Sequence, residues 1–375
     1  MDGVSLTVSN YAAELNRILG PCYTVIPVIP HSHDLPRSDV LQYFSVPLLH
    51  RPPYRLGVPQ VDVPLAWDLL RLRFDLVHAH SPFSAGRLAL RLARRRGIPI
   101  VATLHTKYRD DLIRAIPFPR LVEWEIRRIV KYYESVDEVW VPSSAAREAL
   151  RQYGYRGSVE VVRNGVDLQP PVQAESRRSA PQARSREFVL LYVGQHVWVK
   201  NLGLLIRALA AVRGMGVRFR MVFVGGGYAK EAIKAMVERL GLSNCTTFAG
   251  VVHDRPALAS YYAQANCFLF PSIYDNNPLV VMEAAAFGVP SLLIRDSGAA
   301  EGVVDGVNGF LAENSVQAYA AKLRQVIAHP EAAARAGAGA RQSLYRSWQT
   351  AVAEVRDRYI RLVRKTQRLG EPIPA

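Results

Sequence analysis

Residues 268–301 decide the fold, and their sequence is FLFPSIYDNNPLVVMEAAAFGVPSLLIRDSGAAE. The run Cys267–Phe270 is apolar and rich in large side chains, which predicts a buried strand. A helix is expected next, because the apolar residues take a helical spacing until Gly288 and Pro290 end it. Ser291–Ile294 is predicted as the following strand. A strand, a helix and a second strand in this order indicate a parallel α/β sheet.

The loop before this helix is suited to an anionic ligand, because unpaired N–H groups and the helix dipole point into it. We expect Asn276 or Asn277 to cap the helix and Pro278 to occupy its first turn. Two carboxylates flank the loop: Asp275 lies within it, and Glu283 lies eight residues further on. Since phosphates repel carboxylates, we assign the carboxylates to hydroxyl groups. A ligand with a central diphosphate and hydroxyls at both ends is a nucleotide sugar.

The two acids carry a resemblance to a known family. The stretches DNNP, residues 275–278, and EAAAFGVP, residues 283–290, are similar to the acidic-x7-acidic signature of the retaining, two-domain glycosyltransferases of family 4. The resemblance implies that Asp275 and Glu283 are catalytic, and that Glu283 also binds the donor. It implies the same donor-binding role for Asn276, Asn277, Pro278 and Leu279. Asp275 stands where the family has Glu, so its carboxylate reaches one methylene less.

The family resemblance also implies a fold. We expect α/β architecture of the GT-B type, with two Rossmann-like parallel-sheet domains that face a cleft and a C-terminal helix that crosses back. The chain of 375 residues is long enough for two domains. The expected parts are an N-terminal acceptor-side domain over residues 1–167, a linker over 168–186, a nucleotide-sugar-binding domain over 187–345 and the returning helix over 346–375. The linker is rich in Pro, Ser, Gln and Arg and has no periodic apolar residues.

A second donor loop is predicted in GQHVWVKN, residues 194–201. It resembles the family's Gly-Arg-x5-Lys-Gly loop, in which two basic side chains hold the donor diphosphate. Lys200 matches this pattern, whereas Gln195 replaces the Arg and removes a planar, permanent cation. Either His196 or another residue compensates, or the donor is held differently. The resemblance further implies that backbone groups near Gly250 hold the base.

The acceptor side is predicted from ATLHTKY, which follows a turn and a buried strand. It is similar to the Ala-Thr-x-His-Thr segment of family members that glycosylate lipids, so we expect His105 to be catalytic. We expect Lys107, Tyr108 and His80 to line the acceptor cleft. His78 and His80 lie two apart and share one strand face, so a metal pair is the alternative, although no third ligand of suitable spacing is nearby.

The net charge of +15 permits three kinds of partner: nucleic acid, an anionic membrane surface or phosphorylated substrates. The sequence has no nucleic-acid-binding module, so we expect no nucleic-acid partner. The helix over residues 85–96, AGRLALRLARRR, has an apolar face and a basic face, which is typical of membrane-surface elements. A solvated helix surface is the alternative. We expect a bacterial, cytoplasmic protein that is peripheral on the inner face of the membrane.

The predicted reaction is retaining transfer of a hexosyl group from a nucleoside diphosphate sugar of the UDP-glucose or GDP-mannose type. The expected acceptor is a membrane glycolipid precursor such as diacylglycerol. The alternatives are a soluble saccharide or polysaccharide precursor, or a nonenzymatic sugar-nucleotide binder. No Asp-x-Asp pair stands where a metal would bridge the diphosphate, so no metal cofactor is expected. An NAD-dependent oxidoreductase is disfavoured, because no G-x-G-x-x-G follows a strand.

The first residues predict a loop and a helix with no strand before them. A doubly wound domain normally begins with a central strand, so we expect the first strand to be missing and Met1 to be an internal methionine or a mistaken start. The native protein would then be about 10 to 20 residues longer. The strand predicted over residues 23–29 should lack its usual central neighbour. Gly3, in the loop Asp2–Ser5, is expected to lie near the donor phosphates, although a plain turn glycine is the alternative.

Overall fold

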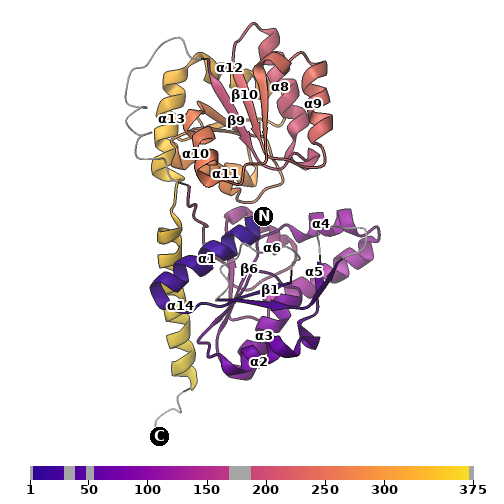
Figure 1. The fold of residues 1–375 in the computed structure, drawn as a ribbon, viewed down its shortest axis with the longest axis vertical. Coiled ribbons are helices and arrows are strands. Elements are labelled where there is room, and N and C mark those ends of the chain that lie inside the picture. The colour runs from indigo at the N-terminus through magenta and orange to yellow at the C-terminus, as the bar shows by residue number, and fades with distance from the viewer. Residues whose placement is uncertain (1–2, 29–38, 48–54, 169–186, 371–375) are drawn as a thin grey trace. The chain divides into compact units, whose positions relative to one another are not determined.

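The computed structural model describes residues 3–28, 39–47, 55–168 and 187–370. The chain forms two compact units (Figure 1), and the second, Gly165–Ser347, is continuous in sequence. The first combines Met1–Asn164 with Trp348–Ala375. Its boundary falls at Asn164 rather than at residue 167, because Val166 is buried in the second unit and donates its N–H to the Arg346 carbonyl at 2.9 Å. The expected linker lies outside the described residues after Leu168.

The second unit is built on a six-stranded parallel sheet with the order β11-β10-β9-β12-β13-β14. Its strands are β9 (Val189–Val193), β10 (Arg220–Val224), β11 (Thr246–Gly250), β12 (Cys267–Phe270), β13 (Ser291–Ile294) and β14 (Phe310–Ala312). The predicted bounds of β12 and β13 are confirmed, and every residue of these two strands is buried.

Helices cover both faces of this sheet (Figure 1). They are α8 (Leu202–Gly214), α9 (Lys230–Arg239), α10 (Arg255–Gln264), α11 (Leu279–Ala286), α12 (Val316–Ala328) and α13 (Pro330–Ser343). Short 3₁₀ turns are η2 (Trp198–Lys200), η3 (Ser243–Cys245) and η4 (Gly298–Ala300). Helix α8 packs against α9 and α12, and α11 packs against α13. The apolar faces of strands and helices thereby form one continuous core.

The first unit contains a four-stranded parallel sheet with the order β5-β6-β7-β8. Its strands are β5 (Val77–Ala79), β6 (Ile100–Thr103), β7 (Glu138–Val141) and β8 (Glu160–Val161). The helices of this unit are α1 (Gly3–Leu19), α2 (Val63–Arg71), α3 (Ser84–Arg96), α4 (Tyr108–Ala115), α5 (Pro119–Tyr133), α6 (Ser144–Gln152) and α14 (Trp348–Gly370), with the 3₁₀ turn η1 (Pro59–Val61). The prediction of two Rossmann-like parallel-sheet units is confirmed.

Two smaller strand pairs complete the first unit. Strand β1 (Thr24–Pro27) runs parallel to β2 (Val40–Tyr43), and β3 (Ser45–Pro47) runs antiparallel to β4 (Arg55–Gly57). Within the described ranges β1 pairs with β2 alone and β5 with β6 alone, so β1 lacks a central neighbour as expected. The single strand expected over residues 43–49 is wrong, because the Phe44 N–H leaves the sheet and donates to the Asp62 carboxylate at 2.7 Å.

The two ends of the first unit meet in one core. Helix α14 packs along α1, and the two lie side by side in Figure 1. Their contact includes Tyr11 and Leu15 from α1 and Trp348 and Val355 from α14, which are buried together with Trp140 of β7. Helix α1 begins at Gly3, so the loop expected over Asp2–Ser5 is helical from that glycine onward. Every helix in the described ranges is too short or too polar to cross a bilayer.

Candidate active site

Two loops of the second unit meet where neighbouring strands end. Strands β9 and β12 are paired and parallel, so their carboxyl ends lie at the same edge of the sheet, where ligands bind in such folds. Asn201 ties the two loops together, since its side-chain N–H donates to the Pro271 carbonyl at 3.2 Å. Asn201 also has a positive φ of 59°, a left-handed conformation that asparagine tolerates well. This arrangement brings the loop of Lys200 against the loop of Asp275.

Lys200 and Asp275 form an ion pair within this edge. The Lys200 Nζ lies 2.5 Å from Asp275 Oδ1, and the two side chains are 15% and 19% exposed. The Ser272 hydroxyl donates to Asp275 Oδ2, also at 2.5 Å. Both oxygens of Asp275 are thus held by donors, and Lys200 is poised at the loop in which a diphosphate is expected. Ser272 was not predicted as a site residue, although it lies in the same loop as Asp275.

Glu283 is buried on α11, with 4% of its surface exposed. The Tyr262 hydroxyl donates to Glu283 Oε2 at 2.8 Å, and Arg255 Nη2 donates to Glu283 Oε1 at 3.2 Å. Burial raises the pKa of the Glu283 carboxyl, while the charge of Arg255 and the hydrogen bond from Tyr262 oppose that rise. The sequence gave no sign of either partner, because Tyr262 and Arg255 lie 21 and 28 positions before Glu283.

The start of α11 differs from the prediction. Pro278 is the N-cap residue and the helix begins at Leu279, so neither Asn276 nor Asn277 caps it and Pro278 is not in its first turn. Pro278 has an extended backbone with φ −72° and ψ 119°, which is why it precedes the helix. Asn276 is instead buried, with 7% of its surface exposed, and its Oδ1 has no hydrogen-bond partner among the described residues. A donor from a ligand would satisfy that oxygen.

The other predicted donor residues lie at the same edge but differ in exposure. The Gln195 side chain is exposed, and its carbonyl accepts a hydrogen bond from the Tyr192 hydroxyl at 2.9 Å. Gly250 ends β11 with a φ of +76°, a conformation that favours glycine, and its carbonyl accepts from the Gly225 N–H at 2.7 Å. Gly3 lies in the first unit, as the first residue of α1.

His196 does not supply the cation that Gln195 lacks. Its ring is buried against Phe223 and Phe248, and neither ring nitrogen has a hydrogen-bond partner among the described residues. Burial, together with the charge of Lys230, lowers the pKa of this imidazole, so the ring is neutral near pH 7. Compensation by a charged His196 is therefore a wrong expectation, and Lys200 is the cation on this loop.

In the first unit, His80 and His105 contact each other at the ends of β5 and β6. His80 Nδ1 lies 2.9 Å from His105 Nε2, and the rings stack with centroids 5.2 Å apart. One nitrogen of the pair must donate and the other accept, so each ring fixes the tautomer of the other. Burial, with His78 and His105 nearby, lowers the pKa of His80 well below its usual range. The structure thus brings together these two predicted residues, which lie on separate strands.

His78 belongs to a different set of contacts. Its Nδ1 lies 2.5 Å from the Tyr359 hydroxyl of α14, and its Nε2 lies 2.7 Å from the Thr103 hydroxyl of β6. Both ring nitrogens are therefore engaged with hydroxyl groups. Burial, and secondarily His105, lowers the pKa of His78 to about 3, so the ring is neutral. Across the described ranges, no three His, Cys, Asp or Glu side chains are grouped as metal ligands.

Tyr108 and Lys107 stand at the start of α4, a helix that was not predicted. Lys107 is the N-cap residue, although its side chain makes no capping hydrogen bond. Tyr108 was expected to line the cleft, but it is only 9% exposed and packs edge to face against Phe83. Burial raises the pKa of Tyr108 above its usual value. Tyr108 therefore belongs to the core of the first unit, because its ring gains more from apolar burial than from exposure.

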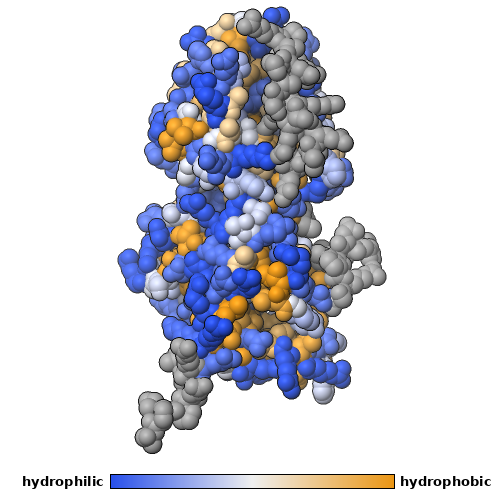
Figure 2. Space-filling view, turned by 90° about the vertical axis from the view of Figure 1, so that its left-hand side faces the viewer, coloured by the Kyte–Doolittle hydropathy of each residue, from blue (hydrophilic) through white to orange (hydrophobic). Residues whose placement is uncertain are grey.

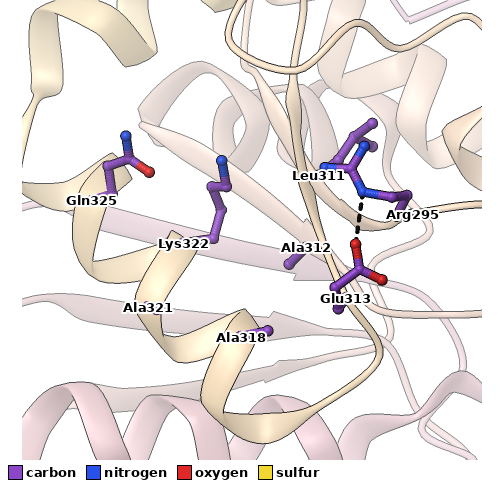
Figure 3. Close-up of a pocket in the computed structure, with 8 residues that line it drawn as sticks. All are labelled: Arg295, Leu311, Ala312, Glu313, Ala318, Ala321, Lys322 and Gln325. Carbon is purple, nitrogen blue, oxygen red and sulfur yellow. Dashed lines mark hydrogen bonds and ion pairs between the residues drawn. The ribbon is translucent and has the colours of Figure 1, made fainter.

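A pocket of about 280 Å³ lies at the outer edge of the second unit's sheet (Figure 3). Arg295 and Glu313, which follow β13 and β14, form one wall, and Lys322 and Gln325 of α12 face them. Arg295 donates to Glu313 at 2.8 Å, and Lys322 donates to Asp305 at 2.9 Å. Because both cations are paired with carboxylates, this pocket offers little surplus charge to a diphosphate. None of its lining residues was predicted for the site.

Comparison with known proteins gives consistent matches. Residues 1–170 match the family model described as Glycosyltransferase Family 4, and residues 173–343 match that of Glycosyl transferases group 1. The D-inositol 3-phosphate glycosyltransferase of Nocardiopsis dassonvillei is 32% identical over 309 residues, or 76% of this chain and 70% of that protein. The alpha-monoglucosyldiacylglycerol synthase of Acholeplasma laidlawii is 26% identical over 255 residues, or 64% and 63% of the two chains. The solved structure of Anabaena HepE with UDP and glucose has a TM-score of 0.72 at 20% identity and covers 95% of both chains.

Proposed function

The chain belongs to glycosyltransferase family 4 and has the GT-B fold, and from this premise we propose that it moves a hexosyl group from a nucleoside diphosphate sugar to a membrane lipid with retention at the anomeric carbon. It is a hexosyltransferase that uses a nucleotide sugar. The proposed donors are of the UDP-glucose or GDP-mannose type. The proposed acceptor is a lipid hydroxyl such as that of diacylglycerol, and a soluble saccharide is the alternative.

One observation carries the donor half of the proposal. Lys200, Asp275 and Glu283 come from separate parts of the sequence, yet all follow the carboxyl ends of β9 and β12. In this assignment Lys200 meets the negative charge that develops on the leaving diphosphate, a contribution that preorganised cations make in dry sites. Asp275 and Glu283 accept hydrogen bonds from donor hydroxyls. His105, steadied by His80, lies on the acceptor side.

The membrane half rests on the surface of the first unit. Arg87, Arg91, Arg94 and Arg95 of α3 are exposed. Arg96 is used differently: its guanidinium donates to the Leu69 and Leu70 carbonyls at 2.6 and 3.0 Å, so it caps the end of α2. This contact holds the basic helix against α2.

Helix α2 adds an apolar stripe beside those arginines. Val63, Trp67 and Leu70 occur at helical spacing and are 62%, 58% and 66% exposed. Figure 2 shows hydrophobic groups exposed among hydrophilic ones on the face of the first unit that it draws. Exposed apolar groups next to exposed cations favour an anionic membrane surface, because lipid tails accept the first and headgroups attract the second. The proposed location is the inner face of the membrane.

The acceptor is tested by incubating the protein with UDP-glucose or GDP-mannose, with and without diacylglycerol vesicles. We expect release of UDP or GDP that depends on diacylglycerol, and a glycolipid product whose anomeric configuration, read by proton NMR, matches that of the donor. Release that requires a soluble saccharide instead would replace the lipid acceptor. An inverted product would contradict retention. We also propose that transfer needs no metal, so the rate should persist after exhaustive treatment with EDTA.

Membrane attachment is tested separately by vesicle flotation. Anionic vesicles should carry the protein, and about 0.5 M salt should release most of it, since surface charges are screened at that ionic strength. Reversing Arg91, Arg94 and Arg95 to Glu, or changing Trp67 to Ser, should weaken flotation. Trp124→Ser removes an indole of α5 that is 48% exposed and serves as the matched control. Equal flotation with neutral and anionic vesicles would contradict the proposal.

A further inference from the structure

Glu283 is held by a network that the family signature does not contain. Arg255 is the first residue of α10 and Tyr262 lies seven positions later, about two helical turns on, so both side chains can face α11 from the same side of α10. Arg255 Nη2 contacts Glu283 and also pairs with Asp167, the last residue of the NGVD turn. The network therefore links three segments of the second unit.

The geometry leaves Glu283 with capacity for a ligand. A carboxylate offers about four lone-pair sites, two on each oxygen. Tyr262 takes one site on Oε2 and Arg255 takes one site on Oε1. One site on each oxygen remains, which suits two adjacent hydroxyl groups. The two protein donors also fix the rotation of the carboxylate, so the free sites point in one direction.

The charges of the network favour the ionised acid. Glu283 is 5% exposed in its side chain, and an isolated carboxylate so deeply buried would tend to take up a proton. A protonated acid would donate to one oxygen of a diol and lose half of its accepting capacity. Arg255 opposes protonation by its charge, and Asp167 holds Arg255 in place. Tyr262 is fully buried and its ring stacks on Phe287 at 5.6 Å, so its hydroxyl has a fixed position.

We infer that Arg255 and Tyr262 are positioning residues that keep Glu283 ionised and oriented to accept two hydrogen bonds from a diol of the nucleotide-sugar donor, with Asp167 anchoring Arg255. This inference rests on the proposed role of Glu283 in donor binding. It adds residues outside the family signature to the donor site. Neither Arg255 nor Tyr262 contacts the donor in this assignment, and each acts through Glu283.

The test is calorimetric titration with UDP-glucose or GDP-mannose, whichever the wild-type protein binds more tightly, between pH 6 and pH 8. The phosphates of a nucleotide sugar stay ionised over this range, so changes in affinity report the protein. Wild-type affinity should be nearly constant. Arg255→Gln should bind about tenfold more weakly at pH 6 and recover most of that loss by pH 8, because the unsupported acid ionises as pH rises. Arg255→Lys should restore part of the affinity.

Tyr262→Phe keeps the stacked ring and removes only the hydroxyl, so it should fold and should weaken binding about threefold. Arg324→Gln removes an exposed arginine from α12 and is the control, with unchanged affinity. In a Glu283→Gln background, which has no acid to ionise, Arg255→Gln should have no further effect and no pH dependence. That double-variant result separates positioning from direct contact or from general destabilisation.

The outcomes distinguish the two levels of the argument. If Glu283→Gln binds the donor as tightly as wild type, the proposed donor role of Glu283 fails. If Glu283→Gln binds weakly but Arg255→Gln matches wild type at every pH, only the positioning inference fails. If Arg255→Gln weakens binding equally with and without the Glu283 carboxylate, Arg255 contacts the donor itself and the inference is overturned.

Discussion

Replacing His78 with glutamine should remove part of the acid sensitivity of the first unit. His78 sits between the Tyr359 and Thr103 hydroxyls, and burial lowers its pKa from 6.5 to about 3. The folded state thus favours the neutral ring, whereas the unfolded chain binds a proton below pH 6.5. The stability that His78 contributes is present above that pH and is lost as pH falls toward 3.

The magnitude follows from those two pKa values. Between pH 7.5 and pH 5 the unfolded chain takes up a proton at His78 and the folded chain does not, which costs about 2 kcal/mol of unfolding free energy. Glutamine has no proton to gain and can still hydrogen-bond a neighbouring hydroxyl. The variant should therefore lose about 2 kcal/mol less than wild type over this interval. His80 remains in both proteins, so both should retain some acid sensitivity.

Urea unfolding followed by tryptophan fluorescence at the two pH values is the assay. Trp67, Trp124, Trp140 and Trp348 belong to the first unit and Trp198 to the second, so the signal reports mainly the unit that contains His78. The comparison between variants at each pH cancels the titration of groups they share. Equal losses of stability in wild type and His78→Gln between pH 7.5 and pH 5 would refute the reasoning.

Further predictions concern the donor loops. Glu283→Gln should reduce the rate of transfer about a hundredfold, measured as UDP or GDP release, because a neutral amide cannot replace charge-assisted hydrogen bonds to a diol; a wild-type rate would remove Glu283 from the site. Asp275→Glu restores the acid usual in the family and should retain activity, so a loss as deep as that of Glu283→Gln would contradict the assigned reach. Lys200→Ala should weaken UDP binding about tenfold in calorimetry, and unchanged affinity would separate this loop from the diphosphate. Gln195→Arg should hold or improve UDP affinity, and weaker binding would show that the exposed position is unsuited to a second cation.

The strands of the second unit could be predicted closely from sequence. Cys267–Phe270 and Ser291–Ile294 are short apolar runs with a proline at one end, and both form strands with the expected bounds. Such runs are informative because a strand buried on both faces has little choice of composition. The start of α11 was less accessible, since Asn276 and Pro278 are both common near helix starts. The backbone then decided that Pro278 itself is the cap.

Contacts between distant segments account for what the sequence did not predict. Glu283 was identified as a site residue from its spacing, but its partners Arg255 and Tyr262 lie on another helix and have no spacing rule of their own. Tyr108 was assigned by its place beside His105, and only tertiary packing against Phe83 shows that it is buried. Local spacing thus predicted which acids matter, while the side chains that hold them depend on how helices pack.

The return of α14 to the first unit has a consequence for the order in which the chain matures on the ribosome. Trp348 and Val355 cover Trp140 and Leu15, so the core of the first unit stays open until the last helix has been synthesised. The second unit, Gly165–Ser347, is continuous and is already complete at that point. The part translated first is therefore expected to finish folding last, and a nascent chain stalled before Trp348 should protect the second unit from protease while the first remains cleavable.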